Sequence, residues 1–142
     1  MTTIDRADLK VLIVDDQEIS RDLVRENLRA MGFTDIHMAE TSDEGTEKIS
    51  THAYDIVFLD WMMPGKSGFL MLKDYRQNRS FDHVAFVMVT SQSNEKLMAE
   101  ALKAGATAYV IKPAMPSIFR PNVETVLEWV LTFNPRFSFL RK

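Results

Sequence analysis

The sequence predicts a doubly wound α/β fold, in which a five-stranded parallel sheet carries helices on both faces. The first observation behind this prediction is that five short apolar runs alternate with five segments of helical character. The second is the length of 142 residues with 46% hydrophobic residues, which fits one domain with a substantial core. Strands that are joined through helices in this way pair in parallel by right-handed crossovers.

The strands are predicted from apolar runs that end in polar residues. Residues 56–59 read Ile-Val-Phe-Leu, and four apolar residues in succession are typical of a strand buried on both faces of a sheet. The other predicted strands are residues 9–14, 36–39, 84–89 and 108–111.

The first two helices are predicted from an apolar stripe and from a capping pattern. The stripe ends before Gly32, a residue that commonly follows a helix, and it consists of Ile19, Leu23, Val24, Leu28 and Met31. Thr41 is followed three residues later by Glu44, which predicts a capping box at the start of a second helix that reaches about Ser50.

The remaining helices follow the third, fourth and fifth strands. We place two of them at residues 67–77 and 97–104, the second ended by Gly105. The last helix is predicted by apolar residues at i, i+3, i+4, i+7 and i+8, namely Val123, Val126, Leu127, Val130 and Leu131. Pro121 is expected in the first turn of this helix, and Asn134-Pro135 is expected to end it.

Composition excludes several classes of function. A net charge of −3 argues against a nucleic-acid-binding surface, and the lack of cysteine excludes disulfides and thiolate sites. The first residues lack the apolar core of a signal peptide, and no apolar run approaches the length that spans a membrane. We therefore expect a soluble, cytoplasmic domain without nucleic-acid or membrane partners.

Polar residues follow four of the five predicted strands. Asp15 and Asp16, Asp60, Thr90 and Lys112 each stand at a carboxyl end, and these ends share one edge of a parallel sheet. Three carboxylates brought together repel one another unless a cation lies between them. In the absence of nearby histidine or cysteine, these hard oxygen ligands favour Mg²⁺, with Mn²⁺ as a substitute.

This set of residues suits phosphoryl transfer. Asp60, alone at the end of the central strand, is the candidate nucleophile, and its attack would form an acyl phosphate. Lys112 and Thr90 would bind oxygens of the phosphoryl group, while Asp15 and Asp16 would hold the metal.

With these residues in order, the sequence resembles the receiver domain of two-component response regulators from about Lys10 to Leu131. The matching motifs are Asp15-Asp16, Asp60 with Met63-Pro64-Gly65 and Gly68, Thr90, Ala104-Gly105-Ala106 and Lys112-Pro113. Three pairs resemble the single-domain chemotaxis regulators (CheY-like) most, namely Asp60-Trp61, Val89-Thr90 and Tyr109-Val110.

The resemblance implies a flavodoxin-like fold with strand order 2-1-3-4-5 and five helices. It also implies a single-domain response regulator that takes a phosphoryl group on Asp60 from a histidine kinase or a histidine phosphotransferase. Asp16, Asp60 and the backbone carbonyl of Met62 would bind Mg²⁺, and Asp15 would act largely through water. Thr90 and Lys112 would bind the phosphoryl group. No organic cofactor is implied.

The same resemblance implies a switch rather than an enzyme. Phosphorylation would draw Thr90 inward and let Tyr109 rotate into the space that it leaves. The face formed by the fourth helix, the fifth strand and the fifth helix would then change shape for a downstream protein, including one in chemotaxis or motility. The protein would be a monomer or a weak, phosphorylation-dependent dimer.

Two side chains depart from the family pattern near Asp60. Met62 replaces a polar residue that is common in chemotaxis members, and we hypothesise that it shields the acyl phosphate and lengthens its lifetime. Gln92, two residues after Thr90, is polar and could help to position an attacking water.

We divide the chain into a receiver domain over residues 1–133 and a short aromatic and basic tail over residues 134–142. Two interpretations of the tail are open. Its aromatic side chains fold back on the last helix or fray, or they form a docking peptide for a kinase, a phosphotransferase or an output protein.

Three other functions compete with the receiver. A haloacid-dehalogenase-like phosphatase would need a second acid where this chain has Met62. A flavodoxin-type mononucleotide module would need a glycine-rich loop after the first strand, where the chain has Asp15-Asp16-Gln17-Glu18 instead. A degenerate receiver that works by protein contact alone would not need the complete acidic set.

Overall fold

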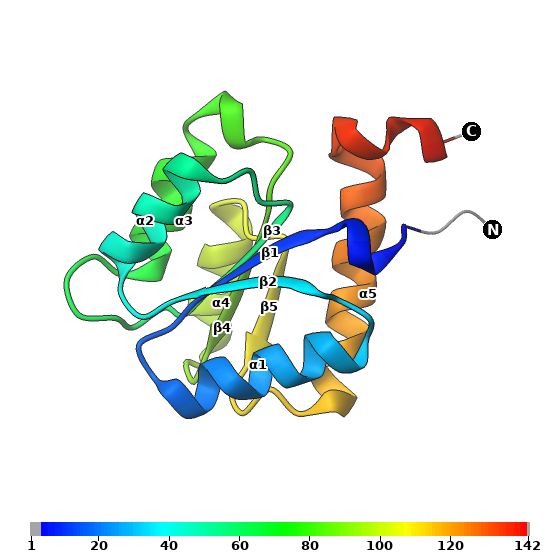
Figure 1. Ribbon diagram of the computed structural model, residues 1–142. Helices are drawn as coiled ribbons and strands as arrows, with labels where there is room; N and C mark the ends of the chain where they lie inside the picture. The colour runs from blue at the N-terminus through cyan, green and yellow to red at the C-terminus, as the bar shows by residue number, and fades with distance from the viewer. Residues whose placement is uncertain (1–3, 142) are drawn as a thin grey trace.

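The computed structural model describes residues 4–141 and contains one five-stranded parallel sheet in the order β2-β1-β3-β4-β5 (Figure 1). The predicted architecture and strand order are therefore confirmed. The strands are β1 (Lys10–Val14), β2 (Asp35–Ala39), β3 (Ile56–Leu59), β4 (Ala85–Thr90) and β5 (Ala108–Ile111).

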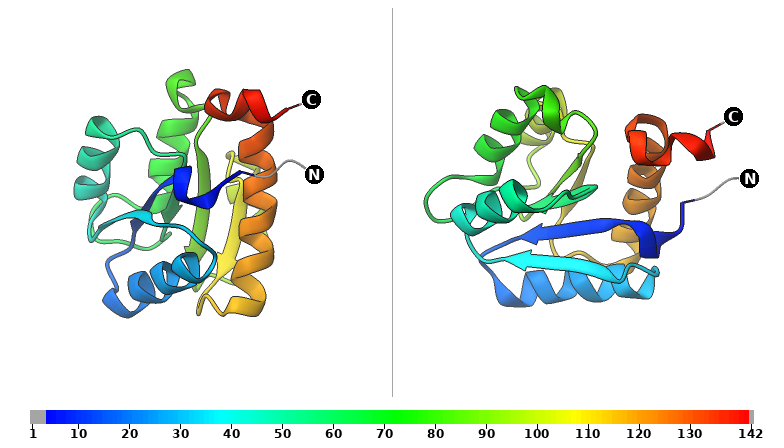
Figure 2. Two further views of the ribbon diagram at one scale, coloured as in Figure 1. Left: turned by 45° about the vertical axis from the view of Figure 1, so that its right-hand side comes forward. Right: turned by 45° about the horizontal axis from the view of Figure 1, so that its top comes forward.

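Helices cover both faces of this sheet (Figure 2). Buried side chains of α1 and α5 pack on one face, and those of α2, α3 and α4 pack on the other. Over the described residues, the five α-helices are α1 (Glu18–Ala30), α2 (Ser42–Thr51), α3 (Gly68–Arg76), α4 (Glu95–Lys103) and α5 (Pro116–Phe133). The same part of the chain has three short 3-10 segments, η1 (Arg6–Asp8), η2 (Arg79–Phe81) and η3 (Pro135–Leu140).

The register brings three strands to one level at their carboxyl ends. Val14, the last residue of β1, pairs with Ala39 of β2 on one side and with Leu59 of β3 on the other. The residues that follow these strands therefore leave the sheet side by side. Asp15 and Asp60 are two of them, as expected for strand ends that share an edge.

Two details of the helices differ from the prediction. Ile19 was placed on the buried stripe of the first helix, but it is 86% exposed, and the buried residues of α1 are Arg21, Val24, Asn27 and Leu28. Pro121 was expected in a first turn, but α5 begins at Pro116 and Pro121 lies inside it. Pro116 thus occupies the first turn of α5, which is the position in a helix where proline is commonly found.

The segment after α5 is attached to the amino edge of the sheet. Asn134 donates to Oδ1 of the buried Asp55 at 2.9 Å, and Arg136 pairs with Oδ2 of the same residue at 2.5 Å. Phe137 is buried in the core shared by α1 and α5, whereas Phe139 is 76% exposed. One aromatic side chain of the segment thus folds back and another does not.

The domain boundary after residue 133 stays a prediction, although α5 does end at Phe133. The first three residues and Lys142, which the predicted domain and tail include, lie outside the described residues. Within residues 4–141, no helix is both long and apolar enough to cross a bilayer.

Candidate functional site

The loop after β1 holds Asp15 firmly and leaves Asp16 at the surface. The Asp15 N–H donates to the carbonyl of Ala39 at 3.1 Å, which continues the pairing of β1 with β2. Its carboxylate Oδ1 accepts the N–H of Gln17 at 2.9 Å, so the side chain also closes the turn into α1. Asp15 is only 2% exposed, while Asp16 is exposed.

Asp60 follows β3 at the same level. Its N–H donates to the carbonyl of Val14 at 3.0 Å, and its side chain is 5% exposed. The start of α3 packs directly on its backbone, because a Cβ built on Gly68 would lie 1.9 Å from the carbonyl oxygen of Asp60. Glycine at position 68 therefore permits the close approach that seats Asp60.

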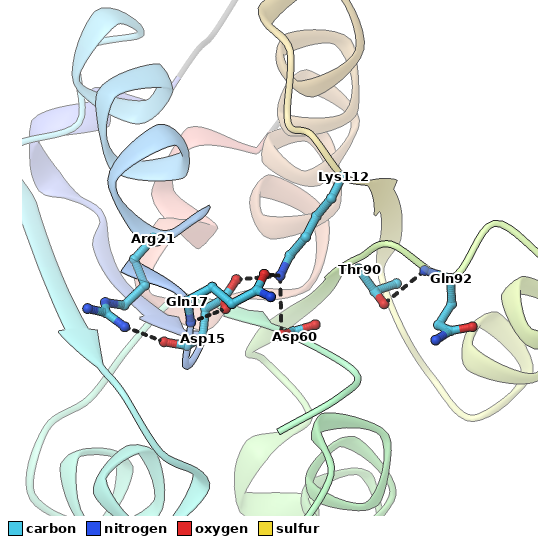
Figure 3. Close-up of polar contacts among 7 residues, drawn as sticks. All are labelled: Asp15, Gln17, Arg21, Asp60, Thr90, Gln92 and Lys112. Atoms are coloured by element: carbon cyan, nitrogen blue, oxygen red, sulfur yellow. Dashed lines mark hydrogen bonds and ion pairs between the residues drawn. The ribbon is translucent and has the colours of Figure 1, made fainter. Parts of the chain in front are cut away.

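Lys112 reaches across the edge from β5 to both carboxylates (Figure 3). Its Nζ lies 2.9 Å from Oδ2 of Asp15 and 3.2 Å from Oδ2 of Asp60, and it donates to Oε1 of Gln17 at 3.1 Å. The side chain is largely buried, and the peptide bond to Pro113 is cis. All three ammonium protons of Lys112 thus have acceptors around the site.

The three aspartates form a group that could hold a metal ion. Carboxylate oxygens of Asp15, Asp16 and Asp60 all lie within 4.8 Å of one another. Burial, followed by the charge of Asp15, raises the pKa of Asp60 from 3.8 to about 6, while Lys112 and the N–H of Met62 act in the opposite direction. Hard oxygen ligands that repel one another fit a small divalent cation such as Mg²⁺.

Thr90 and Tyr109 lie beside this group and are linked through the backbone of Gln92. Oγ1 of the buried Thr90 accepts the N–H of Gln92 at 3.2 Å, and the hydroxyl of Tyr109 donates to the Gln92 carbonyl at 2.6 Å. Tyr109 is already buried, and burial raises the pKa of its hydroxyl. The Gln92 side chain points away from Asp60 (Figure 3).

The structure therefore brings together Asp15, Asp16, Asp60 and Lys112, as the sequence predicted. Within residues 4–141, no hydrogen bond joins Thr90 to Asp60. The roles of all these residues, of the Met62 carbonyl and of the Tyr109 switch remain predictions. Met62 itself is 60% exposed, and its N–H points to the Asp60 carboxylate.

Two residues at the site were not found from the sequence. Gln17 contacts Asp15 through its N–H and Lys112 through its side chain. Arg21 is buried on α1 and donates to the Asp15 carbonyl at 2.7 Å. A signal for Arg21 did exist, because it precedes Val24 and Leu28 by three and seven residues and so lies on the buried stripe.

Comparison with known proteins agrees with this arrangement. The family model for the response regulator receiver domain matches residues 11–123. Chemotaxis protein CheY1 of Helicobacter pylori is 31% identical over 120 residues, which cover 84% of this chain and 97% of that protein. Chemotaxis protein CheY of Pseudomonas aeruginosa is 30% identical over 122 residues, which cover 86% of this chain and 98% of that protein.

The fold agrees as well. The chemotaxis response regulator CheY4 of Vibrio cholerae superposes with a TM-score of 0.76 at 27% identity, covering 84% of this chain and 98% of that one. The match over most of the chain and the acidic group at the carboxyl edge of the sheet lead to one conclusion. The chain belongs to the family of response regulator receiver domains.

Proposed function

We propose that this receiver domain is a phosphoacceptor switch in which Asp60 takes a phosphoryl group from the phosphohistidine of a histidine kinase or a histidine phosphotransferase. The observation that carries the proposal is the place of Asp60. Its buried carboxylate lies at the end of the central strand, beside the Asp15 carboxylate and 3.2 Å from the Lys112 ammonium. This is the environment in which an aspartate serves as a nucleophile toward phosphorus.

The transfer uses groups that surround Asp60. A carboxylate oxygen of Asp60 attacks the phosphorus, the P–N bond of the phosphohistidine breaks, and the imidazole nitrogen keeps the electron pair, so an acyl phosphate forms. Lys112, which contacts Oδ2 of Asp60 before transfer, would turn to an oxygen of the bound phosphoryl group. The Thr90 hydroxyl would donate to another oxygen.

Asp16, Asp60 and the Met62 carbonyl are the groups that we propose for Mg²⁺, with Mn²⁺ as a substitute. When bound, the cation would neutralise charge on the transferring phosphoryl oxygens. Both carboxylate oxygens of Asp15 already have partners, in the Gln17 N–H and the Lys112 ammonium. This supports a role for Asp15 through water rather than by direct contact.

The switch would run from Thr90 to the output face through Gln92. Thr90 and Tyr109 bind the N–H and the carbonyl of the same residue, so a movement of Thr90 toward a phosphoryl group would pull on the contact with Tyr109. Tyr109 lies on β5, between α4 and α5, and Leu102 of α4 is about half exposed on the neighbouring surface. We propose this α4–β5–α5 face for the downstream protein.

The names of two relatives suggest a signalling pathway for the proposed switch. Because two of them are named chemotaxis proteins, we extend the proposal to signalling in chemotaxis or motility. The proposed action is that of a switch with its own phosphorylation and dephosphorylation, not that of an enzyme with a separate substrate.

The test is an intact-mass time course with acetyl phosphate and Mg²⁺. We expect one added phosphoryl group on the wild type, none on Asp60→Asn, and none in the presence of a chelator. Asp82→Asn is the matched control, because Asp82 is an exposed aspartate that precedes β4 at the opposite edge of the sheet. It should gain the group as the wild type does.

A second donor separates donor selectivity from lack of function. If acetyl phosphate fails, a phosphorylated histidine kinase is used instead. No adduct from either donor, or an adduct that persists on Asp60→Asn, would overturn the proposal.

A further inference from the structure

Arg21 is a buried cation on the first turns of α1, and it lies on the side of Asp15 opposite to Lys112 (Figure 3). It is 7% exposed. Its Nη1 donates to the carbonyl oxygen of Asp15 at 2.7 Å, and its Nη2 lies 3.2 Å from Oε1 of Glu40, whose side chain is largely exposed. The guanidinium therefore joins the β1–α1 loop to the residue that follows β2.

Packing alone does not account for an arginine at this position. Burying a guanidinium is costly unless it is paired and hydrogen-bonded, and an apolar side chain of similar volume is often as good or better for stability. The neighbouring buried positions of α1 include Val24 and Leu28, which show that the stripe accepts apolar residues. The bond to the Asp15 carbonyl thus points to a role in holding the loop.

That bond fixes the peptide plane which joins Asp15 to Asp16. The peptide unit is planar, so a donor on the Asp15 oxygen sets the direction in which the chain enters Asp16. Asp15 is held from other sides by Ala39 and Gln17. In the part of the chain that the structure describes, by contrast, no hydrogen bond or ion pair reaches the Asp16 carboxylate. Asp16 is therefore placed by the two peptide planes around it: Arg21 holds the plane before it, and the Gln17 N–H, bonded to Oδ1 of Asp15, holds the plane after it.

We infer that Arg21 is a positioning residue for the divalent cation site: through the Asp15 carbonyl it aims the Asp16 carboxylate toward Asp60. The inference rests on the proposed function, since it takes the acidic group as the Mg²⁺ site. The guanidinium of Arg21 bonds to the Asp15 carbonyl and to Glu40 and not to a carboxylate of the acidic group, so it would act on the cation only through the Asp15 backbone. Its effect is on how well the ligands are arranged before the cation arrives.

A positioning role and a purely electrostatic role of Arg21 predict opposite changes in Mg²⁺ affinity when Arg21 is replaced. Removing a nearby positive charge favours a divalent cation, so a purely electrostatic role makes Mg²⁺ bind more tightly to Arg21→Met. Loss of alignment makes Mg²⁺ bind more weakly. Groups that orient metal ligands typically contribute ten- to a hundredfold to metal affinity, and we expect the dissociation constant of Arg21→Met to rise about tenfold.

The experiment is a Mg²⁺ titration of the unphosphorylated protein followed by Trp61 fluorescence. Trp61 is next to Asp60, and the titrations use a Trp129→Phe background because Trp129 lies on the distant helix α5. The variants are Arg21→Met, Arg21→Lys and Glu40→Gln, and Asp16→Asn serves to show that the signal comes from the acidic group. Circular dichroism establishes that each variant is folded at the temperature used.

Arg21→Lys keeps the charge but offers a single ammonium in place of the two-pronged contact, so its affinity should fall between the wild type and Arg21→Met. Glu40→Gln leaves the bond to Asp15 in place, and its affinity should stay within about twofold of the wild type. If Arg21→Met does not fold, the weaker binding of Arg21→Lys carries the inference.

Two results would overturn it. The first is a Mg²⁺ affinity of Arg21→Met that equals or exceeds that of the wild type, which would mean that Arg21 acts only through packing or through its charge. If only Arg21→Lys folds, the same result in that variant is the second. Failure of the proposed function looks different, because the wild type then shows no Mg²⁺ signal that depends on Asp16, or no phosphoryl group on Asp60.

Discussion

Replacing Asp60 by asparagine should stabilise the metal-free protein at neutral pH. The substitution keeps the shape of the side chain and an acceptor for Lys112, but it removes the charge that burial and Asp15 disfavour. A gain in stability on replacing the residue proposed to carry the chemistry would show that the ionised Asp60 carboxylate destabilises the folded protein as long as no cation or phosphoryl group is bound.

The size of the effect follows from the raised pKa of Asp60. The difference between 3.8 and about 6, at ~1.36 kcal/mol for each pKa unit, means that ionised Asp60 lowers the free energy of unfolding by about 3 kcal/mol at pH 7.5. Because the pKa of Asp60 is higher in the folded state, the part of the stability that depends on its protonation is fully present below pH 4 and is lost as the pH rises through 6. At pH 5 the difference between Asp60→Asn and the wild type should be about half as large.

Urea denaturation in the presence of a chelator at pH 5 and pH 7.5 measures this difference. Mg²⁺ at pH 7.5 should reduce the gap, since a cation that binds only the folded wild type adds to its stability. The control is Asp43→Asn, an exposed aspartate in the first turn of α2, which should change stability by no more than about 0.5 kcal/mol at either pH. Equal stability of wild type and Asp60→Asn at pH 7.5, or a gap that does not depend on pH, would refute the reasoning.

Three further substitutions test other contacts. Arg136→Ala removes the cation from the buried carboxylate of Asp55 and should lower the free energy of unfolding by about 3 kcal/mol, as measured by urea denaturation. Arg136→Lys should restore part of this loss, and unchanged stability of Arg136→Ala would show that Asp55 does not need the guanidinium. Gly68→Ala places a Cβ 1.9 Å from the Asp60 carbonyl and should both destabilise the protein and slow its phosphorylation by acetyl phosphate. Gly45→Ala should be milder, because the nearest atoms to its Cβ are side-chain atoms, the methyl groups of Val14 at 3.0 Å and 3.1 Å and Cε of Met71 at 3.6 Å; equal effects of the two substitutions would contradict the close approach. Met62→Asn should speed the loss of the phosphoryl group several-fold after the donor is removed, as followed by intact mass, because a polar side chain beside Asp60 could position the attacking water. The control is Met115→Asn, at an exposed methionine just before α5; decay of Met62→Asn as slow as in the wild type and in this control would reject the shielding hypothesis.

The parts of the fold that could be predicted are those that depend on a pattern of neighbouring residues in the sequence. Runs of apolar residues located all five strands, and the alternation with helices predicted the parallel sheet. The acidic group followed from the same reasoning, because parallel strands deliver Asp15, Asp60 and Lys112 to one edge without any knowledge of distances. The strand order came from the family resemblance.

What could not be predicted depends on contacts between distant parts of the chain or on the exact phase of a helix. Asp55 and Arg136 are 81 residues apart, and neither carries a local signal for the other. Ile19 was misplaced because α1 turns Arg21 and Asn27 inward, and both are polar residues that a hydrophobic pattern ignores. The start of α5 was missed because Pro121 suggested a first turn that Pro116 provides instead.

The attachment of the C-terminal segment to Asp55 has a practical consequence for handling the protein. Asp55 precedes β3, so η3 is fixed at the amino edge of the sheet, and the described ends near residues 4 and 141 emerge on the same side of the molecule, away from the loops that carry Asp15 and Asp60 (Figure 1). A chip surface, a resin or a fluorescent fusion joined at either end would leave the acidic edge open to solution. Immobilisation through either terminus should therefore preserve access for a kinase, for Mg²⁺ and for small phosphodonors.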